Sequence, residues 1–75
     1  QDPTCCARAE IVAKLTGDYN EAASAVGLSS EGLIGEVFNS PGTGTWTMLT
    51  TRPDGATCVV AVGEMWSVVP QGAPT

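Results

Sequence analysis

Three cysteines, Cys5, Cys6 and Cys58, carry most of the reactive chemistry in this chain. On a helix predicted over 3–16, Cys5 points to the apolar side and Cys6 points about 100° away from it. Cys58 falls on the more apolar face of a predicted strand. We therefore predict a Cys5–Cys58 disulfide, with Cys6–Cys58 as the alternative pairing. The cysteine left over, Cys6, is expected to be a partly buried thiol or to form an intermolecular disulfide.

Arg8 is the charged residue with the clearest structural consequence. On the predicted helix it falls in the middle of the apolar stripe, where an unpaired guanidinium is costly. Its end must therefore reach the edge of the stripe or meet a carboxylate. We predict a largely buried Arg8 in an ion pair with Glu36, with Glu21 as the second choice. The alternative role is an anion site for a ligand carboxylate.

Several common kinds of functional site are excluded by missing residues. The chain has no histidine, which removes the commonest general base and the commonest metal ligand. Its serines lie in predicted turns without the glycine-flanked elbow of a hydrolase nucleophile. The segment from Asp18 begins like a calcium loop, but Ala22 and Ala23 replace a ligand and the required glycine. We expect no catalytic site, no metal and no cofactor.

The helix over 3–16 is predicted from apolar residues that recur on one side at helical spacing. These residues are Cys5, Ala9, Ile11, Val12, Leu15 and Tyr19. Asp2 and Pro3 are typical of a helix start. Gly17 is expected to end the helix, because glycine readily adopts the left-handed conformation found there.

Strands are predicted for the rest of the chain, which alternates apolar and polar residues and is rich in threonine and valine. We place them at 22–28 and 33–39, followed by a hairpin over 45–62. Its turn, 52–56, contains a proline that presets φ, an aspartate that bonds the backbone, and Gly55 in the left-handed position.

The two faces of this hairpin differ in polarity. The first face carries Trp46, Met48, Thr50, Cys58, Val60 and Val62. The second carries Thr47, Leu49, Thr51, Thr57, Val59 and Ala61. Because the first face is more apolar, we expect the helix to cover it, with Trp46 in the core. Leu49 and Val59 are then predicted to contact a partner, and Trp66 is either a plug at the sheet end or a partner-binding anchor.

Together these elements predict an α+β fold, in which an N-terminal amphipathic helix packs on an antiparallel meander of three to four strands, stapled by a disulfide. A chain of 75 residues allows a single domain, expected over 1–67, with a flexible C-terminal tail over 68–75. The longest apolar run, Cys58–Val62, is far shorter than the roughly 20 residues of a membrane-spanning helix. We expect no direct membrane insertion.

Eight acidic and three basic residues give a formal net charge of −5 at pH 7. This charge repels phosphate backbones and anionic lipids, so we expect no nucleic-acid partner. The sequence Gln1-Asp2-Pro3 is typical of the end that signal-peptide cleavage leaves. The expected location is periplasmic or extracellular, where disulfides are allowed.

A spaced set of residues covers most of 5–66. It comprises Cys5, Arg8, Leu15, Tyr19, Glu21, Glu36-Val37-Phe38, Gly44-Thr45-Trp46-Thr47, Pro53-Asp54-Gly55, Cys58, Gly63-Glu64 and Trp66. This pattern resembles a group of small secreted alphaproteobacterial proteins of unassigned function. The resemblance implies a signal-peptide-derived N-terminus and one cysteine near each end, and it implies no activity. Cys6 has no counterpart in the pattern.

The features above favour a non-catalytic secreted or periplasmic protein-binding module, or an accessory subunit of a larger assembly. The expected partner is another protein or a second copy of the chain. The alternative is a small-ligand binder or inhibitor that uses Arg8 or the Trp66 end of the sheet.

Overall fold

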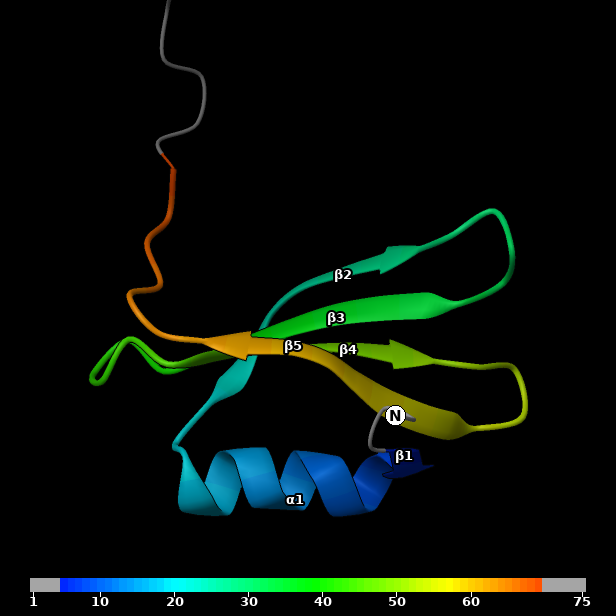
Figure 1. The fold of residues 1–75 in the computed structure, drawn as a ribbon, viewed down its shortest axis with the longest axis horizontal. Coiled ribbons are helices and arrows are strands. Elements are labelled where there is room, and N and C mark those ends of the chain that lie inside the picture. Colours follow the sequence, from blue (N-terminus) through cyan, green and yellow to red (C-terminus); the bar gives the residue numbers. More distant parts are fainter. Residues whose placement is uncertain (1–4, 70–75) are drawn as a thin grey trace, which may run out of the picture.

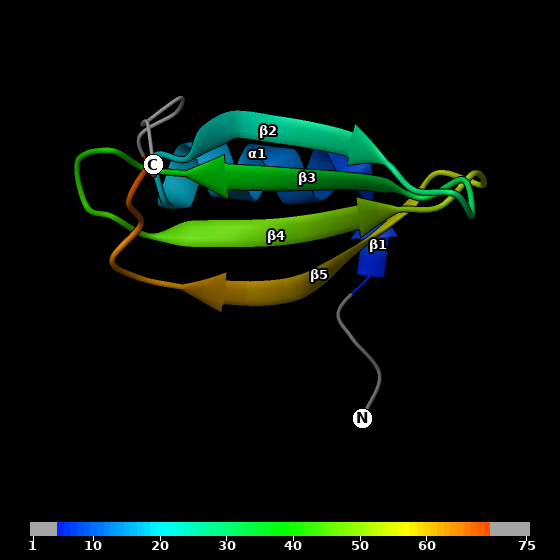
Figure 2. The same ribbon diagram turned by 90° about the horizontal axis from the view of Figure 1, so that it is seen from above.

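The structure is a computed structural model that describes residues 5–69. Its elements in chain order are β1 (Cys5–Ala7), α1 (Arg8–Asp18), β2 (Ala22–Leu28), β3 (Ile34–Asn39), β4 (Trp46–Thr51) and β5 (Ala56–Gly63). The strands form one antiparallel sheet in the order β1-β5-β4-β3-β2. Helix α1 lies against one face of this sheet (Figure 1), and Figure 2 shows the long strands side by side above it.

The α+β class and the antiparallel meander are confirmed, but the N-terminal element differs from the prediction. Residues 5–7 form a strand that pairs with 56–58 of β5, so the described sheet has five strands. The helix begins at Arg8, not at residue 3. Helical periodicity within 3–16 does not reveal that a partner strand lies about fifty residues further along the chain. The predicted start at Asp2 and Pro3 lies outside the described residues.

The helix end also differs from the prediction. Gly17 lies inside α1, which runs to Asp18. The left-handed residue is Asn20, with φ 54°, and the N–H of Glu21 donates to the carbonyl of Leu15 over 2.9 Å. Asparagine adopts this conformation more readily than most residues other than glycine, which explains why the helix continues past Gly17.

The β4–β5 turn has the predicted chemistry. The N–H of Arg52 donates to the Ala56 carbonyl and the N–H of Gly55 to the Arg52 carbonyl, both over 2.9 Å. Gly55 has φ 94°, and Asp54 Oδ1 accepts from the Ala56 N–H at 2.9 Å. This turn fixes the predicted register for the first three residue pairs, after which the register shifts between Met48 and Leu49.

The helix covers the face that was predicted to be outer. The buried core consists of Ile11, Leu15, Phe38 and Leu49, with Cys6, Val12 and Val59 packed against it. Leu49 has 0% of its surface exposed, so the prediction that Leu49 and Val59 contact a partner is wrong. From the β4–β5 hairpin alone, the face with Trp46 and Met48 is predicted to be covered by the helix. The hairpin sequence does not show that Phe38 of β3 adds a large apolar side chain to the other face.

Two of the threonines on this covered face pair their hydroxyls with each other. Thr51 and Thr57 are buried, and their hydroxyls form a hydrogen bond of 2.8 Å across the strands. A buried hydroxyl is costly only without a partner. A face rich in threonine can therefore be a core face, which a count of apolar residues does not reveal.

After β5 the chain turns back across the end of the sheet. The N–H of Trp66 donates to the carbonyl of Gly44 over 2.9 Å, and the rings of Trp66 and Trp46 lie 6.3 Å apart. Val68 and Val69 are exposed and belong to no helix or strand. The remainder of the predicted tail, 70–75, lies outside the described residues. Within 5–69, no helix has the length and hydropathy that a membrane span requires.

Candidate functional site

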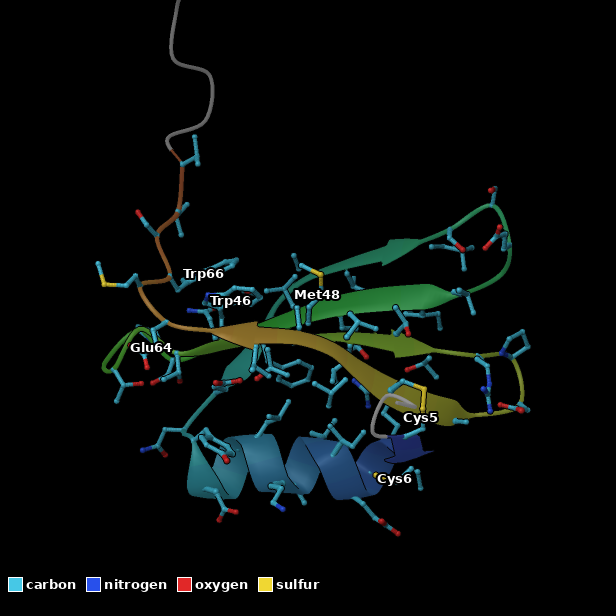
Figure 3. The ribbon with its side chains drawn as sticks, in the orientation of Figure 1. Cys5, Cys6, Trp46, Met48, Glu64 and Trp66 are labelled. Atoms are coloured by element: carbon cyan, nitrogen blue, oxygen red, sulfur yellow. A yellow bond between two sulfur atoms is a disulfide. The ribbon has the colours of Figure 1, made fainter. Side chains whose placement is uncertain are left out.

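A disulfide joins Cys5 of β1 to Cys58 of β5, where the two residues face each other across the strands. The predicted pairing is confirmed, although Cys5 lies on a strand and the bridge is on the face away from the helix. Cys6 points to the opposite side, beside α1 (Figure 3). It is a free, partly buried thiol. Its expected intermolecular disulfide remains a prediction.

Arg8 and Glu36 form the predicted ion pair. Arg8 Nε donates to Glu36 Oε1 at 2.9 Å, and Arg8 Nη2 donates to Oε2 at 2.6 Å. The Arg8 side chain is 48% exposed and that of Glu36 is 8% exposed. The prediction that Arg8 is largely buried is therefore wrong, because Arg8 is the first residue of α1 and not part of its core face.

The electrostatics of this pair follow from its geometry. The hydrogen bond from Arg8 lowers the pKa of Glu36, against an opposing effect of burial, and the same bond raises the pKa of Arg8. Two guanidinium nitrogens of Arg8 are directed at Glu36. This geometry gives Arg8 a structural role and does not favour the alternative in which it holds a ligand.

In the described residues, no helix or strand covers the face of the sheet opposite α1, although Trp66 packs against Trp46 at one end of it. By strand register this uncovered face carries Ala25, Gly27, Gly35, Val37, Asn39, Trp46, Met48, Thr50, Cys58 and Ala61. None of these residues is charged. Figure 3 shows Met48, Trp46 and Trp66 on this side, away from the helix. The prediction that Trp46 lies in the helix-covered core is therefore wrong.

The two ends of the uncovered face have opposite shapes. At one end, a shallow hollow of about 370 Å³ is lined in part by Gly27, Gly35 and Thr50. At the other end the Trp46 ring lies over Gly63, where an added Cβ would come within 2.6 Å of it. Trp46 Nε1 donates to the Glu64 carbonyl at 3.0 Å, which fixes the ring in place.

A larger cavity, of about 520 Å³, lies on the covered side between α1 and β4–β5. Cys6 and Glu21 are among its lining residues. Glu21 is buried, and the alternative pairing of Arg8 with Glu21 is not formed, because Arg8 pairs with Glu36. This cavity is not evident from the sequence, because its wall is built from residues that only the tertiary fold brings together.

Comparison with family models, with curated proteins and with solved structures gives no match. Among residues 5–69, no three histidine, cysteine or acidic side chains are grouped as metal ligands would be. The protein is therefore a small α+β protein with a disulfide between two neighbouring strands. Such a disulfide is typical of a protein that folds in an oxidising environment, outside the cytoplasm.

Proposed function

We propose that this protein is a non-catalytic, periplasmic or extracellular protein-binding module, and that its uncovered face binds a second copy of the chain. The observation that carries the proposal is the absence of charged residues from this face in a chain with a net charge of −5. A face without charges can be removed from water without burying an ion. Large apolar side chains on it, such as Met48, then favour association.

The shape of the face supports a second copy as the partner. Trp46 and the glycine hollow lie at opposite ends, about 14 Å apart along β4 at the usual rise of a strand. A twofold axis between two such faces places Trp46 and Trp66 of each copy over Gly27 and Gly35 of the other. The interface is then self-complementary, as twofold dimers require. Two sheets can pack in this way about 10 Å apart.

The size of the face predicts how strong the association is. Strands about 4.8 Å apart, with a rise of about 3.4 Å per residue, give its four long strands roughly 400 Å² in projection. A stable complex commonly buries about 800 Å² on each partner. We therefore expect a weak, concentration-dependent dimer, which higher salt strengthens by screening the repulsion between two acidic chains.

Sedimentation across a range of protein concentrations tests this proposal. The C6S variant serves as background, so that no intermolecular disulfide contributes. Met48→Glu puts a charge on the uncovered face and should leave only monomer. Val26→Glu adds the same charge on the helix side of β2, where Val26 is 71% exposed, and should leave the dimer intact.

The interpretation depends on both variants being folded, which circular dichroism and melting temperature establish. Gly35→Leu, which fills the hollow, should also yield monomer. A C6S protein that is monomeric at millimolar concentration would overturn the proposal of a second copy. Equal effects of Met48→Glu and Val26→Glu would show that net charge, and not the uncovered face, controls the association.

A further inference from the structure

The cavity between α1 and β4–β5 is open because β5 is only partly paired on its outer side. β1 covers residues 56–58 of β5, so 59–63 pair with β4 but have no strand on their outer side in the described sheet. The cavity of about 520 Å³ that results has an apolar wall that includes Ile11, Leu15, Val59 and Val62. Its volume falls within the range of about 300–1,000 Å³ that is typical of small-molecule sites.

Glu21 lines this cavity and is the only acidic residue among the lining residues that is buried. Its side chain is 3% exposed, and Oε1 has no hydrogen-bond partner. Buried polar atoms in folded proteins nearly always have partners, because an unpaired one is costly. An acceptor without a donor, on a residue that lines a cavity, points to a ligand that supplies the donor.

The charges around the cavity define the sign of that ligand. Glu10 and Glu64 also line it, with Lys14 as the one basic residue among the lining residues. In the part of the chain that the structure describes, the ion pairs are Arg8–Glu36 and Arg52–Asp54. Lys14 therefore does not neutralise Glu21, and the cavity favours a cation over an anion.

We propose that this cavity binds a small amphipathic amine. Its ammonium donates a hydrogen bond to the Glu21 carboxylate, and its apolar body lies against Ile11, Leu15 and Val59. An ammonium offers three donors and forms a charge-assisted bond with a carboxylate, which is stronger than a bond between neutral groups. A neutral or anionic ligand of the same shape lacks this bond. Trp46 lines both this cavity and the uncovered face, but the residues that hold the amine take no part in the proposed dimer, so this proposal is independent of dimer formation.

Three compounds with one apolar body and different head groups test the proposal. Cyclohexylmethylamine, cyclohexylmethanol and cyclohexanecarboxylate are each titrated into the ¹⁵N-labelled protein and followed by amide chemical shifts. The amine should bind about tenfold more tightly than the alcohol, as expected for one charge-assisted hydrogen bond, and shift residues that line the cavity. The carboxylate should not bind measurably.

Two variants with the same change in net charge identify the residue responsible. Glu21→Gln should abolish the preference for the amine, whereas Glu31→Gln, in the exposed β2–β3 turn, should keep it. Without ligand, Glu21→Gln should melt no lower than Glu31→Gln, because it removes an unpaired buried carboxylate. Val62→Trp, at an exposed wall position, should block binding and leaves Glu21 in place.

The proposal is overturned if the amine and the alcohol bind equally, or if Glu21→Gln retains the preference. It is also overturned if Glu21→Gln melts well below Glu31→Gln or fails to fold, because Glu21 would then have a structural partner. Loss of amine binding in both Glu21→Gln and Val62→Trp, with binding unchanged in Glu31→Gln, supports it.

Discussion

The Arg8–Glu36 ion pair is unequal in burial, and this inequality determines which partner matters more for stability. Glu36 lies on β3 on the covered face and is 8% exposed, whereas Arg8 is 48% exposed. When the arginine is removed, a buried carboxylate loses both of its donors. When the carboxylate is neutralised, the guanidinium can still turn to water.

We predict that Arg8→Met lowers the free energy of unfolding at pH 7 by about 1–3 kcal/mol, the cost of an unsatisfied buried acceptor. Glu36→Gln should cost less, roughly 1 kcal/mol or below, since a half-exposed arginine forms only a modest ion pair. Urea denaturation of the two variants measures the order. A larger loss for Glu36→Gln would contradict it.

The pH dependence of stability checks the same ion pair independently. Because Arg8 lowers the pKa of Glu36 in the folded protein, the stabilisation is complete above the unfolded pKa. It is lost as the pH falls through the folded pKa, below the usual carboxyl range near pH 4. In Arg8→Met only burial acts on Glu36, so this acid loss should disappear. The pKa of Asp54 is also lowered, mainly by the hydrogen bond from the Ala56 N–H. Because Asp54 is present in both proteins, its contribution to the pH dependence of stability cancels in the comparison.

At the scale of elements, the bulge in β5 changes which residues face the helix. After the register shift, Met48 pairs with Ala61 and Thr47 pairs with Val62. A slip of one residue moves a side chain to the other face of a sheet. Val62 therefore lies on the covered side, where it helps to form the wall of the cavity.

The end of α1 offers a test of element boundaries. Gly17 lies within the helix, and an added Cβ would have nothing within 4 Å. We predict that Gly17→Ala stabilises the protein by about 0.5–1 kcal/mol, because glycine is unfavourable inside a helix. Thermal unfolding measures the change.

The matched control for Gly17→Ala is Asn20→Ala. Asn20 has φ 54°, a left-handed conformation that costs most residues about 1–2 kcal/mol. This variant should therefore be destabilised. If Gly17 ended the helix, as its sequence suggests, Gly17→Ala would destabilise the protein instead.

For the whole molecule, the disulfide compensates for a small core. Among residues 5–69, the buried apolar cluster consists of Ile11, Leu15, Phe38 and Leu49. Domains of this size rarely gain more than about 3–5 kcal/mol from their cores. The Cys5–Cys58 bridge, with a sequence separation of 53, restricts most of the unfolded chain.

We predict that replacing both Cys5 and Cys58 by serine lowers the free energy of unfolding by about 4 kcal/mol, from the loop entropy that the bridge removes. The double variant should then retain only the few kcal/mol that the core supplies. C6S should retain most of the stability of the unmodified protein. Circular dichroism during urea titration measures all three proteins, and a loss below about 1 kcal/mol in the double variant would show that the core alone supports the fold.

Local features of the sequence were sufficient for much of this structure. The strands at 22–28 and 33–39 and the turn at 52–56 were predicted because alternation and turn chemistry act over a few residues. The Cys5–Cys58 and Arg8–Glu36 pairs were also predicted, because a small domain with three cysteines and three basic residues leaves few possible partners, although the predicted helix position of Cys5 was wrong.

Only the tertiary structure determined which face of the sheet is covered and where a cavity opens. Residues 5–7 became a strand because β5 offered a partner, and Leu49 became buried because Phe38 and α1 lie on its side. Glu21 became a buried acceptor because α1 and β4–β5 enclose it. Each of these outcomes depends on contacts between distant segments, whereas periodicity within one segment shows only that two faces differ.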